Sequence, residues 1–112
     1  MTRVTIYTRA GAYEGYDVHG HAGYAIAGED VVCAAVSCLT FTCVNAMEDA
    51  CGAPPVVDAD DKTARLSVSM PPSYTAEQRE SARAMMRFMV IGLADLAAQY
   101  PQYLTLTEIE KR

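Results

Sequence analysis

A long apolar segment in the first half of the chain constrains the fold most strongly. Over residues 30–50 it carries large apolar side chains on nearly every side of a helical projection: Val31, Val32, Val36, Leu39, Phe41, Val44 and Met47. A helix with this profile is expected to be buried on most of its faces. Gly52 suits the position after the last helical residue, and Pro54 and Pro55 prevent continuation. The rest of the chain must therefore supply surfaces that cover this helix.

Short alternating segments on both sides of the helix supply such a surface. Five of them predict strands, at residues 2–8, 12–19, 55–59, 63–70 and 103–107. Gly11 and the run 60–62 are expected to form the turns of two hairpins. In the second strand, Tyr16 and Val18 should point to one face, while Asp17 and His19 should point to the other.

A second helix follows the second hairpin. Thr75 and Gln78 form a capping box, and Pro101 ends the segment. Its apolar stripe is expected to fill a core against the sheet. The predicted order is therefore β-β-α-β-β-α-β, and residues 1–112 should form a single α+β domain. We expect two layers, with a mostly antiparallel sheet and two long helices.

Composition narrows the range of partners. Hydrophobic residues make up 51% of the 112 residues, slightly more than usual, so some apolar surface is expected to be buried against a second subunit. The net charge is −5 and no basic run occurs, which argues against binding duplex nucleic acid or an anionic membrane. Met1 leads directly into a strand without an apolar leader. The longest apolar stretch of the first helix is expected to be too short and too interrupted to span a bilayer. We therefore expect a cytoplasmic protein.

Four cysteines lie at positions 33, 38, 43 and 51. The first three are spaced by five residues, which rotates each by about 140° from the last and prevents convergence on one metal ion. No CxxC pair is present, so we expect no metal and no cofactor. Cys38, Cys43 and Cys51 are expected to be packed, unreactive thiols.

Cys33 stands apart because it should lie in the first turn of the helix, with Asp30 as the N-cap. The amino-terminal end of a helix favours a thiolate, and the free amides of Cys33 and Ala34 could hold an oxyanion. A histidine is the usual base for a cysteine nucleophile. Spacing alone leaves two candidates, His19 and His21.

A glycine-bearing loop is expected to join the second strand to the helix. Gly20, Gly23 and Gly28 should make residues 20–29 flexible, so that the loop can bring His21 to the helix start. Asp30 could orient the imidazole or merely cap the helix. Ser37 lies on the same helical stripe as Cys33 and could donate a hydrogen bond to a substrate, or bond to its own backbone.

The run from Gly20 to Ala25 and the run from Gly28 to Ser37 closely resemble the ribosomal-processing cysteine protease family, Prp. The spacing of twelve residues between His21 and Cys33 matches the family pattern. The resemblance implies a bacterial, homodimeric α+β protein that removes a short N-terminal extension from a large-subunit ribosomal protein. It also implies Cys33 as nucleophile and His21 as base, with Asp30 and Ser37 in support.

Three functions remain to be distinguished. The main hypothesis is a cysteine endopeptidase. The alternative is a non-catalytic, dimeric, ribosome-associated binding protein in which Cys33 is merely packed. A thiol redox protein is a weaker third reading, because Cys38 and Cys43 are poorly placed on the helix to resolve a disulfide with Cys33.

Overall fold

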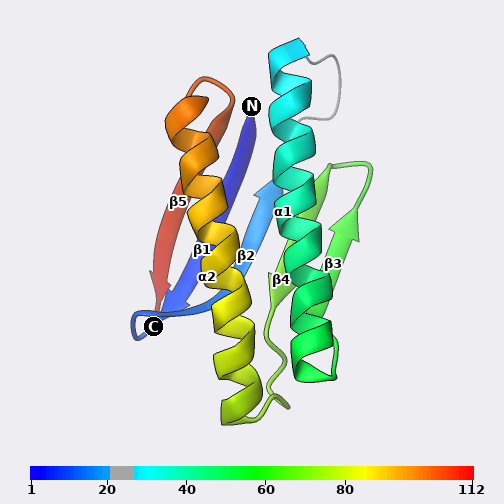
Figure 1. Ribbon diagram of the computed structural model, residues 1–112, viewed down its shortest axis with the longest axis vertical. Coiled ribbons are helices and arrows are strands. Elements are labelled where there is room, and N and C mark those ends of the chain that lie inside the picture. The colour runs from blue at the N-terminus through cyan, green and yellow to red at the C-terminus, as the bar shows by residue number, and fades with distance from the viewer. Residues whose placement is uncertain (21–26) are drawn as a thin grey trace.

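The computed structural model describes residues 1–20 and 27–112 (Figure 1). Within these ranges the chain forms β1 (Thr2–Arg9), β2 (Ala12–His19), α1 (Ala27–Cys51), β3 (Val56–Asp60), β4 (Arg65–Ser69), α2 (Ala76–Gln99) and β5 (Leu104–Lys111). The predicted element order and the two-layer α+β class are confirmed. Both helices cover the same face of the sheet, and the other face is open (Figure 1).

The sheet has the strand order β3-β4-β2-β1-β5. Both hairpins and the β2–β4 pair are antiparallel, whereas β5 returns to pair in parallel with β1. In the β1–β2 turn, Ala10 and Gly11 have φ values of 51° and 78°. Positive φ at both central residues matches the twist of a two-residue hairpin turn. The first hairpin, β1–β2, lies between β4 and β5 in the sheet.

The second hairpin is shifted relative to its prediction. β3 includes Asp60, which pairs with Arg65 at the end of the ladder, and residues 61–64 make the turn. Ala64 adopts a φ of 50°, so the extended backbone of β4 begins at Arg65, two residues later than the alternation suggested. Asp60 is therefore a strand residue, and the turn projects beyond it.

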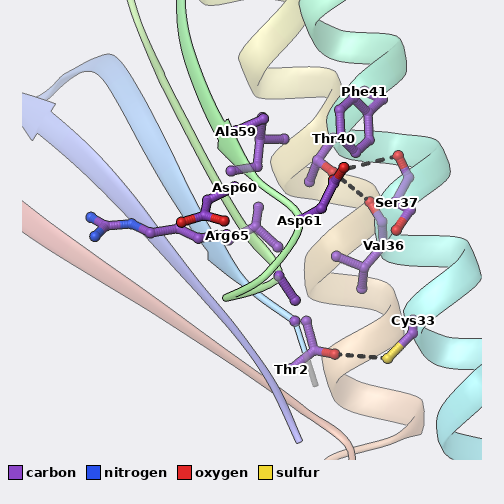
Figure 2. Close-up of a pocket in the computed structure, with 14 residues that line it drawn as sticks. Thr2, Cys33, Val36, Ser37, Thr40, Phe41, Ala59, Asp60, Asp61 and Arg65 are labelled. Atoms are coloured by element: carbon purple, nitrogen blue, oxygen red, sulfur yellow. Dashed lines mark hydrogen bonds between the residues drawn. The ribbon is translucent and has the colours of Figure 1, made fainter. Parts of the chain in front are cut away.

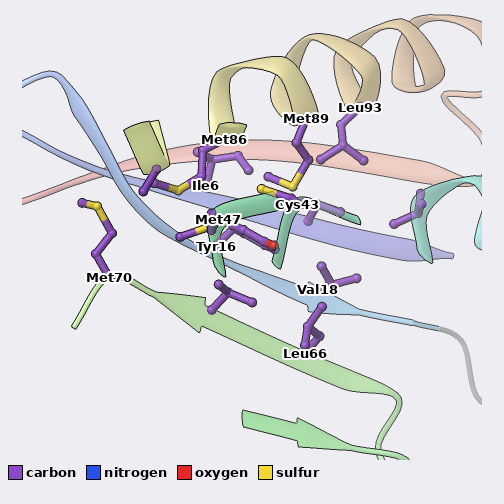
Figure 3. Close-up of a cluster of buried hydrophobic side chains, with 14 of the residues drawn as sticks. Ile6, Tyr16, Val18, Cys43, Met47, Leu66, Met70, Met86, Met89 and Leu93 are labelled. Carbon is purple, nitrogen blue, oxygen red and sulfur yellow. The ribbon is translucent and has the colours of Figure 1, made fainter. Parts of the chain in front are cut away.

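The core lies between the helices and the covered face of the sheet (Figure 3). Strand alternation directs Ile6, Tyr16 and Leu66 into it, and Tyr16 shares this face with Val18, as predicted. Met86, Met89 and Leu93 contribute the buried stripe of α2. That helix begins with the predicted capping box, in which Thr75 and Gln78 exchange side-chain and backbone hydrogen bonds. The stripe fills the core, as predicted.

Helix α1 differs from its prediction in burial. Only one side packs into the core, through Val32, Val36, Cys43 and Met47. On the outer side, Val31 is 64% exposed and Phe41 is 49% exposed. The expectation of burial on most faces is therefore wrong for a single chain, because the sheet covers one side of α1 and α2 covers only part of another.

The expectation that the apolar stretch of this helix is too short and too interrupted to span a bilayer is also wrong. Residues Asp30–Cys51 of α1 are long and apolar enough to cross a membrane by length and composition. In the folded chain, however, α1 packs its buried side against the strands and α2, as the core helix of a globular domain does.

Candidate active site

A cavity of about 220 Å³ lies between α1 and the β3–β4 turn (Figure 2). Helix α1 contributes Cys33, Val36 and Ser37 to its lining. Thr2, Gly20, Asp60 and Asp61 also line it. The cavity brings together parts of the chain that are distant in sequence, because the β2–β4 pairing places the turn beside the helix.

Cys33 is partly buried at this cavity, and its sulfur contacts a hydroxyl group. The Sγ atom lies 3.1 Å from the Oγ1 atom of Thr2, a residue that is 1% exposed (Figure 2). Sequence reasoning missed Thr2. Thr2 is separated from Val4 and Ile6 by even numbers of positions along β1, so strand alternation could have shown that it points inward. The contact with Cys33 could not have been found that way, because it depends on how the helix packs on the sheet.

The other three thiols occupy different environments. Cys43 is 4% exposed, and burial raises its pKa to about 11, opposed only by a hydrogen bond with Tyr16. Cys51 donates to the carbonyl of Gln78 at 3.2 Å. Cys38 is exposed on the outer side of α1, so the expectation that it is packed is wrong. Of the four, only Cys33 lines this cavity.

The structure describes one of the two candidate histidines, His19. His19 is exposed on β2 and points to the open face, because its neighbour Val18 is buried on the covered face. It therefore points away from the layer that carries Cys33. His21 and Gly23 lie outside the described residues. Gly20, which precedes His21 in the chain, lines the same cavity as Cys33.

Two of the glycines expected in a flexible loop have defined places. The amide of Gly20 donates to the carbonyl of Ala64 at 2.6 Å, which ties this residue to the β3–β4 turn. Gly28 belongs to the first turn of α1. The loop prediction is therefore wrong for Gly28, which is helical, whereas Gly20 lies outside every helix and strand, as predicted.

The expected helix start is also corrected. Because α1 begins at Ala27, Asp30 lies within its first turn and is not the N-cap. Cys33 and Ala34 belong to the second turn, where each amide bonds to the carbonyl four residues earlier. Their amides are therefore not free to hold an oxyanion. Asp30 is exposed and does not line the cavity.

Ser37 lies one turn after Cys33 and lines the cavity, as its helical spacing predicted. The Ser37 side chain is exposed, so a molecule in the cavity could reach its hydroxyl. Arg65 also borders the cavity, but its guanidinium extends away from the helices (Figure 2) and lies 3.4 Å from Asp17. Among the side chains that the structure describes, no three potential metal ligands gather at one point.

Comparison with known proteins shows the family. A family model described as cysteine protease Prp matches residues 1–105. The chain belongs to the Prp family of cysteine proteases. Its enzyme class is therefore that of a peptide hydrolase, as the motif predicted.

Individual proteins resemble the chain in sequence and in fold. The ribosomal processing cysteine protease Prp of Bacillus subtilis (strain 168) is 29% identical over 92 residues, which cover 82% of each chain. A crystal structure of a Streptococcus mutans protein has a TM-score of 0.88 at 27% identity, covering 99% of this chain and 96% of that one. Prp from S. aureus, crystallised with a substrate peptide, has a TM-score of 0.84 at 22% identity, covering 97% and 100%.

Proposed function

We propose that this Prp-family member is a cytoplasmic endopeptidase that removes a short N-terminal extension from a large-subunit ribosomal protein, with Cys33 as nucleophile and His21 as base. The observation that carries the proposal is the position of Cys33. It is the one thiol of four that lines the cavity, and Gly20, the chain neighbour of His21, lines the same cavity. A peptide entering there would meet the sulfur of Cys33 and also Gly20, the residue that precedes His21 in the chain.

The mechanism follows from these two groups. His21 accepts the proton of Cys33, and the thiolate attacks the carbonyl carbon of the scissile bond. His21 then returns the proton to the leaving amine, and water hydrolyses the acyl-enzyme that remains. Donors other than the amides of Cys33 and Ala34 must hold the oxyanion, because those amides are paired within α1. Ser37 supplies a hydroxyl to the bound peptide, and Asp30 orients His21.

The catalytic assignment is tested with a precursor peptide that spans the extension and the mature N-terminus. Cys33→Ala and His21→Ala should each reduce cleavage by about 10⁴-fold or more, as for catalytic residues in other proteases. Cys38→Ala and His19→Ala are matched controls, because they remove an exposed thiol of α1 and the histidine on the open face. Both controls should cleave at the wild-type rate. Undiminished cleavage by Cys33→Ala would overturn the assignment.

The names of the relatives support the substrate. The Bacillus subtilis relative is named a ribosomal processing protease, and the S. aureus structure holds a substrate peptide. Mass spectrometry of the full-length ribosomal precursor should show one cleavage, and a scrambled extension should remain intact. If the wild-type protein binds the precursor but does not cleave it, the non-catalytic binding alternative is correct.

The outer side of the helix layer supports the expected homodimer. A second cavity, of about 600 Å³, lies between α1 and α2 and is lined almost wholly by apolar atoms. Phe88, which lines this cavity, is 76% exposed, and Ile91 on the same helix is 57% exposed. A second copy of the chain that covers this side would bury the apolar surface that the single chain leaves exposed.

Light scattering coupled to gel filtration tests the dimer. Wild type should elute at twice the chain mass, and Phe88→Glu should elute as a monomer because it places a charge in the interface. Ile109→Glu is the matched control, since Ile109 is 46% exposed on β5, away from the helices. A monomeric wild type, or equal behaviour of both variants, would contradict the proposed interface.

A further inference from the structure

Thr2 holds a fixed position beside the sulfur of Cys33. Its backbone amide donates to the carbonyl of Tyr103 at 2.8 Å, and its strand pairs with β5 in the register Thr2↔Leu104. The whole residue is 1% exposed. The hydroxyl is therefore held by the sheet while the sulfur is held by α1, and the two atoms meet at 3.1 Å.

The chemistry of the two groups decides which one donates in the reactive state. A hydroxyl carries one donor hydrogen and two acceptor lone pairs, whereas a thiolate can only accept. Among the described residues, the Cys33 sulfur is the one hydrogen-bond partner of the Thr2 hydroxyl. Once Cys33 has lost its proton, the Thr2 hydroxyl donates to the sulfur, and its burial keeps water from competing.

We propose that Thr2 is a positioning residue that holds the Cys33 thiolate at the cavity. The proposal rests on the assignment of Cys33 as the nucleophile. Both residues line the cavity (Figure 2). The hydrogen bond therefore holds the sulfur from the side of the sheet, and the rest of the sulfur surface faces the space that a peptide would enter. Loss of the bond should leave a folded enzyme whose thiolate forms less readily and is less well aimed.

The test measures alkylation of Cys33 by iodoacetamide as a function of pH, with peptide mass spectrometry to identify the labelled thiol. In Thr2→Val, which keeps the shape but removes the hydroxyl, the pH of half-maximal rate should rise by about one unit. Thr2→Ser keeps the hydroxyl and should restore the wild-type midpoint. In peptide cleavage, Thr2→Val should lower kcat by about tenfold with little change in KM.

A second buried threonine on the same strand provides the matched control. Thr8 is 3% exposed, and its hydroxyl donates to Glu110 at the far end of β1. Thr8→Val should leave both the pH midpoint and kcat unchanged. If Thr2→Val and Thr8→Val give the wild-type midpoint alike, the proposal for Thr2 is wrong.

The role of Cys33 as nucleophile and the role of Thr2 can be disproved separately. If Cys33→Ala still cleaves the precursor peptide, the assignment of the nucleophile fails, and Thr2 has no thiolate to position. If Cys33→Ala is inactive but Thr2→Val keeps both the wild-type pH midpoint and the wild-type kcat, only the inference about Thr2 fails. Circular dichroism of the Thr2 variants shows whether each has folded, and Thr2→Ser still tests the hydroxyl if Thr2→Val does not fold.

Discussion

The two faces of the sheet differ sharply, although the same strands build both. On the covered face, β2 presents Tyr16 and Val18 to the core beneath the helices. On the open face, the same strand presents Asp17 and His19. A shift of one residue in register would exchange the two sets. Register thus decides which side chains share a layer with the thiols, and it separates His19 from Cys33.

Hydrogen bonding on the two faces follows the same division. The Tyr16 hydroxyl is buried and donates to the carbonyl of Thr40 at 2.7 Å, and burial raises its pKa well above the ordinary range. On the open face, Tyr7 donates to Asp17 at 2.9 Å, and Ser67 also donates to that carboxylate. The covered face therefore depends on bonds that water cannot replace, while the open face carries a solvent-accessible polar network.

The largest expected effect concerns the thiols of α1. A thiol with a pKa of about 11 is ionised in roughly one molecule in 10⁴ at pH 7, and Cys43 is also buried. Cys43 should therefore react with iodoacetamide at least about 100-fold more slowly than exposed Cys38. Mass spectrometry of native and urea-unfolded protein checks this, since unfolding should equalise the two rates. Comparable native rates would show that the covered face opens readily.

A smaller effect should distinguish the two tyrosines. Tyr16→Phe leaves the buried Thr40 carbonyl without this donor and should cost about 1–2 kcal/mol of unfolding free energy. Tyr7→Phe removes a bond on the open face, where water can replace it, and should cost about 0.5 kcal/mol or less. Urea denaturation of both variants measures the difference. Equal costs would mean that the two faces do not differ in this respect.

The smallest effect concerns the pH dependence of stability on the open face. Burial opposes ionisation of Asp17, but hydrogen bonds from Ser67 and Tyr7 and the charge of Arg65 outweigh it, so the pKa of Asp17 lies below its ordinary value of 3.8. A carboxyl whose pKa is lower in the folded state stabilises the fold above pH 3.8, and this contribution is lost as the pH falls through its folded pKa.

Asp17→Asn should therefore reduce the loss of stability that wild type shows on acidification below about pH 4. At neutral pH the variant should be slightly less stable than wild type. Urea midpoints measured between neutral and acidic pH test this. Parallel curves for the two proteins would show that Asp17 contributes no acid sensitivity. Asp58→Asn, an exposed change on β3, serves as the control.

Much of the fold was predictable because local patterns and long-range packing agree. Alternation in β1, β2 and β4 and the capping box of α2 identified those elements. The boundaries of α1 and of the second hairpin were not predictable in the same way. Asp30 is a good N-cap residue, but the helix continues past it to Ala27, and the strand ladder extends to Asp60. Propensity alone does not decide where such elements end.

The sequence by itself determined the element order, the α+β class, and the spacing of His21 and Cys33 that indicated the family. Only the tertiary structure decided that Cys33 meets Thr2 at a cavity, that His19 faces away from it, and that α1 leaves an apolar side exposed. Helix and strand patterns depend on backbone geometry and side-chain type, so residues that are close in sequence are enough to reveal them. Contacts between a helix and a distant strand depend on how the layers pack, so they exist only in the folded chain.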